Sequence, residues 1–171
     1  MKANDTTTYY DEIDSPVGRL RLVADAGGLC GMYFEVESHP TALEPDWVRA
    51  SQPLASAHRQ LDEYFGGKRQ TFDLALNPHG TPFQLAVWRQ LRSIPYATTI
   101  SYGELARRVG NPAASRAVGA ANGRNPLSII VPCHRVIGAS GTLTGYGGGL
   151  PIKQFLLELE RHTVHGDLFA A

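Results

Sequence analysis

Residues Ile129–Ile137 read IIVPCHRVI, an apolar run that is interrupted by proline, cysteine, histidine and arginine and then resumes. Ionisable groups between apolar flanks are costly to bury unless they are paired or take part in chemistry. A cysteine beside a histidine and an arginine is in surroundings that favour the thiolate over the thiol. The stretch therefore indicates that Cys133 is a nucleophile; the alternatives are a structural cysteine in a turn and the Cys-His pair of a hydrolase.

Upstream of this stretch, the sequence predicts two short helices joined by a tight turn. Ser101 and Glu104 have the spacing of a capping box, which begins a helix that ends near Gly110. Asn111-Pro112 then begins a second helix at once, Ala113–Gly123, with asparagine as its N-cap and proline in its first turn. Two short helices at this spacing are a candidate helix-turn-helix.

The second of these helices consists almost entirely of small residues, and Arg116 is its only long polar side chain. Helices that read the DNA major groove usually present several long hydrogen-bonding side chains. A shape-fitting or minor-groove role with a single wedge therefore fits this helix better. Tight packing of a small-residue helix in the core explains the segment equally well.

The first part of the chain reads as short strands separated by turns, followed by one helix. The helix covers about Pro53–Phe65, with apolar residues on one face, and Gly66-Gly67 ends it. Thr71–Leu76 is a candidate for a further strand. The other strands are expected at Thr7–Glu12, Leu20–Ala24 and Leu29–Phe34.

The turn-forming residues of Asn77–Pro82 predict a domain boundary. Beyond it, Phe83–Arg92 has apolar residues at helical spacing and is expected to build core. We therefore predict an α/β (α+β) protein with a small N-terminal sheet-and-helix domain over residues 1–78, which supports the rest. A mainly helical domain over residues 79–171 would carry Cys133 and a winged helix-turn-helix-like DNA-binding motif.

Charge is distributed unevenly although the formal net charge is zero. Residues 1–80 carry 7 Lys and Arg against 12 Asp and Glu, whereas residues 81–171 carry 9 against 4. A local basic face of this kind suits contacts with phosphate groups. Chance clustering on a solvated surface is the alternative.

The two cysteines, Cys30 and Cys133, lack a partner at zinc-ligand spacing. Cys30 lies in an apolar run that reads as a buried strand, where free cysteine packs as an inert small hydrophobe. Four of the histidines outside the Cys133 stretch show no paired metal spacing either; they are His58, His79, His162 and His165. The sequence therefore predicts no metal.

The sequence has no run of roughly 20 apolar residues, the length needed to span a bilayer. Its first residues, Met1–Asp5, are polar and lack the apolar run of a secretory signal. These features predict a cytoplasmic protein without a membrane partner.

Taken together, Pro132–Arg135, Thr144–Leu150, Ser101–Gly103, Asn125-Pro126 and the Arg116 helix closely resemble the methylated-DNA–protein-cysteine methyltransferase family. The resemblance runs from about Thr81 to Glu160, roughly half of the chain. It implies direct DNA repair: an irreversible, once-only transfer of the alkyl group of O6-alkylguanine to the protein, after the base flips out through the minor groove. Double-stranded DNA with the lesion would be the partner, and neither a cofactor nor an obligate protein partner is implied.

The resemblance also assigns catalytic residues. Cys133 would be the alkyl acceptor, and His134 would relay its proton through water to Glu160. Asn125 would brace the turn that holds the cysteine, and Tyr102 would donate a hydrogen bond to the flipped guanine.

For the remaining contacts, Arg116 would enter the duplex where the base has left, and the backbone of Cys133 and Val136 would read the guanine edge. Lys153 and Tyr146 would shape the pocket. Gly147 stands where some relatives have serine, so a side-chain hydrogen bond to the leaving oxygen is missing. The other residues expected to contact substrate or DNA are Ser115, Ala117 and Arg135.

Two other classes compete with this interpretation. A cysteine hydrolase would also use Cys133 and His134 but would regenerate its thiol. A binding-only alkyltransferase-like protein or helix-turn-helix regulator would recognise DNA without reacting. The cysteine itself counts against the second class, and the DNA-type helices count against the first.

Overall fold

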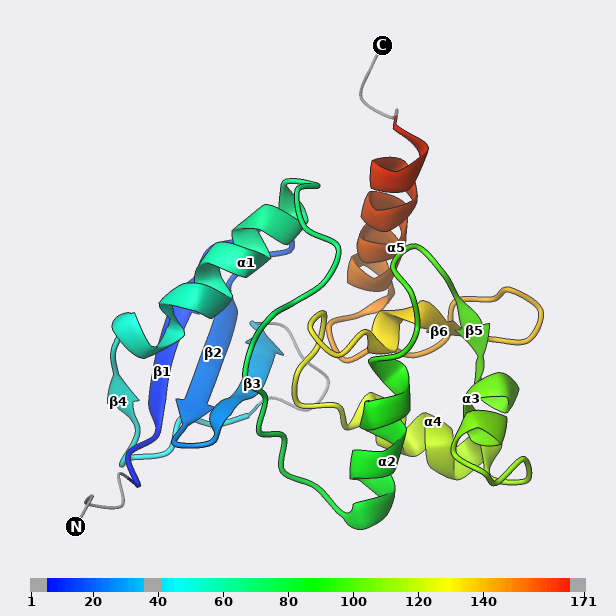
Figure 1. The fold of residues 1–171 in the computed structure, drawn as a ribbon, viewed down its shortest axis with the longest axis horizontal. Helices are drawn as coiled ribbons and strands as arrows, with labels where there is room; N and C mark the ends of the chain where they lie inside the picture. Colours follow the sequence, from blue (N-terminus) through cyan, green and yellow to red (C-terminus); the bar gives the residue numbers. More distant parts are fainter. Residues whose placement is uncertain (1–5, 36–40, 167–171) are drawn as a thin grey trace.

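The computed structural model describes residues 6–35 and 41–166. It has two parts, which lie side by side (Figure 1). The N-terminal part is a sheet covered by one helix, and the C-terminal part is a group of helices. The polar N-terminal residues Met1–Asp5, on which the prediction of a missing secretory signal rests, lie outside the described residues. Within the described ranges, no helix is both long and apolar enough to cross a bilayer.

The N-terminal sheet has the strand order β3-β2-β1-β4. Its strands are β1 (Tyr9–Ile13), β2 (Leu20–Asp25), β3 (Gly28–Phe34) and β4 (Val48–Arg49). The first three pair antiparallel, and β4 pairs parallel with β1. The strands β1 to β3 lie where the sequence predicts them, whereas β4 is too short to leave a signal.

The helix α1 (Ala55–Phe65) follows a single 3-10 turn (Gln52–Leu54) and lies across the sheet (Figure 1). It buries Ala57, Leu61 and Tyr64, as its apolar spacing predicts. The prediction of a strand at Thr71–Leu76 is wrong. Within this segment only Leu76 pairs with a strand residue, in an isolated bridge with Leu29. The side chain of Gln60 satisfies both backbone groups of Asp73, at 2.8 and 2.9 Å. Only the end of the segment bonds to β3, where Ala75 accepts from Leu29 and Asn77 donates to it.

The C-terminal part begins with α2 (Pro82–Leu91), where Thr81 and Gln84 form a complete capping box. Ser101 caps α3 (Tyr102–Arg108), as predicted, but the side chain of Glu104 turns instead to Arg107 and Arg108. The remaining elements are α4 (Ser115–Gly123), a 3-10 turn (Cys133–Arg135), a parallel pair of β5 (Ile100–Ser101) with β6 (Val136–Ile137), and α5 (Leu150–His165).

The start predicted for the second helix of the helix-turn-helix is wrong. Ala114, not Asn111, is the N-cap of α4. The amide of Ala114 donates to the carbonyl of Asn111 at 3.0 Å, which closes a separate turn ahead of the helix. This turn lengthens the connection between α3 and α4.

One hydrophobic core joins the two parts. The amide of Met32 in β3 donates to the carbonyl of Pro126 at 2.8 Å, and Met32 forms a bridge with Leu127. The edge of the N-terminal sheet therefore supports the segment that leads to Cys133.

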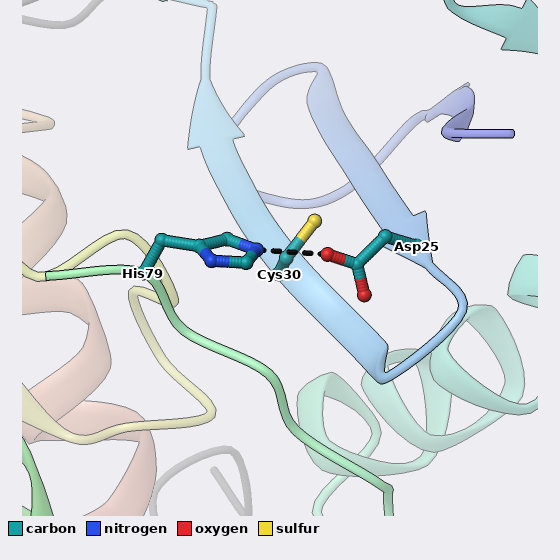
Figure 2. Close-up of side chains that lie close together, drawn as sticks. All are labelled: Asp25, Cys30 and His79. Atoms are coloured by element: carbon teal, nitrogen blue, oxygen red, sulfur yellow. Dashed lines mark hydrogen bonds and ion pairs between the residues drawn. The ribbon is translucent and has the colours of Figure 1, made fainter. Parts of the chain in front are cut away.

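Cys30 is only half-buried, contrary to the buried position that its apolar neighbours predict. Figure 2 shows its sulfur beside Asp25 and His79, and the ligand-type atoms of these three residues lie within 4.8 Å of one another. His79 Nε2 lies 2.8 Å from an oxygen of Asp25, and Asn77 donates to the same carboxylate at 2.8 Å. These contacts fasten the segment between the two parts to the β2–β3 turn; that the protein holds no metal stays a prediction.

Candidate active site

Cys133 begins the 3-10 turn after Pro132, and it is buried. Asn125 braces the preceding loop, since its side-chain amide donates to the carbonyl of Val131 at 2.8 Å and its oxygen accepts from the amide of Leu127 at 3.0 Å. Ile129 lies in the same loop with φ of 72°, a conformation that costs a β-branched residue about 1–3 kcal/mol. Neighbouring contacts thus hold a strained loop in the shape that presents the cysteine.

The thiol of Cys133 is protonated at rest. Burial raises its pKa, and the side chains of Asn125, Lys153 and Ser128 only partly oppose this shift. The sequence-based expectation of a thiolate-favouring environment is therefore wrong for the resting protein. A base must take the proton before the sulfur can react.

His134 and Glu160 lie together in the interior, both without exposed surface. His134 Nε2 lies 2.6 Å from Glu160 Oε2. Burial would raise the pKa of Glu160, but hydrogen bonds from His134 and Arg135, together with the positive charge of Arg135, outweigh burial and hold that pKa far below its usual range. The carboxylate therefore stays charged and accepts a hydrogen bond from Nε2–H of the ring.

The other ring nitrogen of His134 is suited to act as a base. Burial lowers the pKa of His134, although Glu160 opposes the shift, so the ring is neutral at pH 7. With its proton on Nε2, the neutral ring carries an acceptor lone pair on Nδ1. Nδ1 is buried and has no hydrogen-bond partner among the residues that the structure describes.

Arg135 is not placed for contact with DNA, so its predicted role there is corrected. Its guanidinium donates to Glu160 Oε1 at 2.8 Å, to Glu160 Oε2 at 3.0 Å and to the carbonyl of Ile94 at 2.8 Å. It also lies 5.5 Å from the ring centre of Tyr96. A buried arginine with all these partners stabilises the charge of Glu160 and does not reach phosphate.

A groove of about 660 Å³ opens between α4 and the loop before α5. Thr144 in this loop donates a hydrogen bond to the hydroxyl of Tyr102 at 2.9 Å. Arg116 is exposed on α4, next to the exposed Ala117. The predicted site residues that line the groove are Tyr102, Ser115, Arg116, Tyr146 and Gly147.

Lys153 connects this groove to the strand after Cys133. Its buried ammonium donates to the carbonyl of Val136 at 2.7 Å and to the carbonyl of Thr144 at 3.0 Å. Burial lowers the pKa of Lys153, and the nearby Cys133 opposes that shift. Val136 is wholly buried and its carbonyl accepts from Lys153, so the guanine contact that the resemblance implies for its backbone stays a prediction.

The structure pairs His134 with Glu160 in the interior, places Tyr102 at the groove, and has Asn125 brace the loop before Cys133. Cys133 itself is not among the residues that line the groove. Two donors to Glu160 are not predicted by the sequence: Tyr64 and the amide of Ala97. Their distance along the chain left no local signal. Thr144 belongs to the quoted motif, but nothing in the sequence indicated its bond to Tyr102.

Comparison with known proteins covers nearly the whole chain. Residues 8–78 match the ribonuclease-like domain, and residues 82–162 the DNA binding domain, of 6-O-methylguanine DNA methyltransferase. The chain is 51% identical to a methylated-DNA–protein-cysteine methyltransferase of Methanosarcina acetivorans, over 89% of this chain and 97% of the relative. The corresponding Mycobacterium tuberculosis protein is 47% identical, over 94% and 96%. The solved structure of M. tuberculosis OGT in complex with DNA superposes with a TM-score of 0.87, covering 91% of this chain and 94% of that one.

Proposed function

The chain belongs to the methylated-DNA–protein-cysteine methyltransferase family, and we propose that Cys133 is the residue onto which it transfers the alkyl group of O6-alkylguanine in DNA. It is an enzyme of DNA repair that acts by alkyl transfer, and its substrate is double-stranded DNA that carries the lesion. The observation that carries the assignment of Cys133 is its position. A buried thiol precedes His134, which is paired with Glu160, and Lys153 links the strand after Cys133 to Thr144 in the lining of an open groove.

The chemistry needs a nucleophile, a proton acceptor and a way to stabilise the leaving group. The proton of Cys133 passes through a water molecule to Nδ1 of His134, and Glu160 stabilises the imidazolium that forms. The sulfur then attacks the alkyl carbon as the carbon–O6 bond breaks and its electron pair passes to the guanine. The hydroxyl of Tyr102 donates a hydrogen bond or its proton to the guanine anion.

Ionisation of the thiol explains only a small part of the rate. At an ordinary pKa of about 8.5, roughly 3% of a thiol is ionised at pH 7, so full ionisation gains about 2 kcal/mol. Because burial raises the pKa of Cys133, a smaller fraction of its thiol is ionised at pH 7. In-line positioning and stabilisation of the leaving guanine must supply the rest.

The target atom lies inside the base stack, so the nucleotide must leave the duplex at a cost of a few kcal/mol. Arg116 lies exposed on α4, among residues small enough to let the helix approach a groove closely. It fills the space of the flipped base, while Ser115 and Ala117 contact the adjacent backbone. This arrangement supports entry through the minor groove without a sequence code.

The division into residues 1–78 and 79–171 is part of the proposal, and the two matched domains at 8–78 and 82–162 support it. We further propose a cytoplasmic monomer that needs no metal or cofactor and no obligate protein partner. One damaged base needs one acceptor, so no symmetry is required.

The experiment that tests the proposal follows the amount of guanine formed in duplex DNA containing O6-methylguanine, with DNA in excess over protein. A rapid phase of one guanine per protein that then stops supports a transfer in which the acceptor is consumed. Continued turnover would indicate a hydrolase. Tight binding to the lesion without guanine formation would indicate a binding-only protein.

A further inference from the structure

The N-terminal part of the chain contributes a side chain to the catalytic network. Tyr64 lies in α1, 96 residues before Glu160, yet its hydroxyl donates to Glu160 Oε2 at 2.6 Å. Neither residue has exposed surface. A contact this short between a neutral donor and a charged acceptor is a strong hydrogen bond.

Tyr64 shares its acceptor atom with the proposed base. Oε2 accepts from Tyr64 and lies 2.6 Å from His134 Nε2, while Arg135 donates to it at 3.0 Å. A carboxylate oxygen has two lone-pair directions. The direction occupied by Tyr64 therefore restricts where His134 can bind and fixes the rotation of the carboxylate.

The tyrosine is itself held rigidly. Its ring packs against Phe65, Phe72 and Tyr96, with centroids 5.4, 5.6 and 6.3 Å away. Burial, and next the charge of Glu160, raise the pKa of Tyr64 well above its ordinary value, so its hydroxyl stays a donor. A fixed donor of this kind limits the movement of the group that it binds.

We propose that Tyr64 is a positioning residue for alkyl transfer: its hydroxyl orients Glu160, and through Glu160 it aligns His134 with Cys133. The N-terminal domain thereby completes the active site of the C-terminal domain, beyond its supporting role. The inference rests on the proposed role of His134 as the proton acceptor.

The test replaces the hydroxyl alone, in Tyr64→Phe. We expect the rate of alkyl transfer to fall about tenfold, the effect of losing one hydrogen bond to a charged group. The factor should be the same for duplex DNA and for free O6-benzylguanine, and the affinity for DNA should not change. Tyr96→Phe is the matched control, because it removes a hydroxyl from a ring packed against Tyr64 and is expected to keep the rate. An unchanged rate in Tyr64→Phe, or an equal loss in both variants, would overturn the proposal.

A double-mutant cycle separates positioning from a general loss of structure. Glu160 keeps its contacts with His134, Arg135 and Ala97 in Tyr64→Phe, so we expect this variant to fold, which thermal unfolding checks. In a His134→Gln background, Tyr64→Phe should change the residual rate less than about twofold, because the two changes remove parts of one network. A tenfold loss in both backgrounds would mean that Tyr64 does not act through His134. A His134→Gln variant as fast as the wild type would instead overturn the proton relay itself.

Discussion

The hydroxyl of Thr144 donates to the hydroxyl of Tyr102 at 2.9 Å, which leaves the proton of Tyr102 free to point elsewhere. Lys153 holds the carbonyl of the same threonine at 3.0 Å. The loop before α5 and the first residue of α3 are thus joined where the groove opens. The proton of Tyr102 is therefore available for the hydrogen bond to guanine that we propose.

This relationship predicts that Tyr102→Phe slows alkyl transfer far more than it weakens DNA binding. The lost donor acts on the charge that develops on the guanine, so a rate loss of about 100-fold is expected. Single-turnover rates and a binding isotherm on the same duplex measure the two effects. Equal losses in rate and affinity would remove Tyr102 from its proposed role.

Arg116→Ala should slow repair of duplex DNA much more than reaction with free O6-benzylguanine. The free base needs no extrusion from a stack, so a wedge contributes nothing to its reaction. Arg107→Ala, on the neighbouring helix α3, is a control for the loss of one exposed positive charge. Similar losses on both substrates would contradict the wedge.

Acid should destabilise the protein in two stages. Burial is the main cause of the lowered pKa of His134, so the neutral ring stabilises the fold fully at pH values above its unfolded pKa of about 6.5. This stabilisation is lost as the pH falls below that value. The pKa of Glu160 is lowered by His134 and Arg135 despite burial, so its contribution is lost further down, below about pH 4.3.

The check is the urea midpoint between pH 8 and pH 2. The wild type should lose stability from about pH 6.5 downward, and His134→Gln should remove only the upper stage. A wild-type midpoint that is constant down to pH 5 would contradict a buried neutral His134.

A side chain should be tolerated at Gly147 but should lower the stability of the protein at Gly148. A Cβ at Gly147 meets no atom within 4 Å, so Gly147→Ser should keep the stability within about 0.5 kcal/mol. We expect the new hydroxyl to supply the side-chain hydrogen bond to the leaving oxygen that the resemblance implies for a serine here, so the transfer rate should rise. A Cβ at Gly148 would lie 2.7 Å from the ring of Phe34, so Gly148→Ala should cost about 1–3 kcal/mol.

Thermal unfolding of both variants and the transfer rate of Gly147→Ser test this pair. A Gly147→Ser variant with a lower melting temperature than Gly148→Ala would contradict the described packing. An unchanged rate would mean that the serine does not reach the substrate.

Local patterns were enough to predict the parts of the fold that depend on neighbouring residues. The apolar face of α1 and the three main strands follow from spacing within one segment. The strand expected at Thr71–Leu76 is reduced to an isolated bridge at Leu76, because the side chain of the distant Gln60 satisfies the backbone of Asp73. Asn111 failed as a cap because the chain makes an extra turn before α4.

The candidate site was predictable only where its residues lie in one motif. The stretch around Cys133 indicated a reactive cysteine and its neighbouring histidine. It could not show that Arg135 points inward, since an arginine beside a cysteine is compatible with either DNA or a buried carboxylate. The contact of Tyr64 with Glu160 joins residues 96 positions apart and depends on how the two parts pack.

The central claim is that Cys133 is the alkyl acceptor, and intact mass followed by peptide mapping tests it most directly. After incubation with duplex DNA containing O6-methylguanine, we predict a gain of one methylene group, about 14 Da, on Cys133, as expected for S-methylation of a thiol. The gain should saturate at one per chain, and Cys133→Ser should show none while Cys30→Ser gains it in full. A methyl group on another residue, or guanine formed while the mass stays unchanged, would contradict the account.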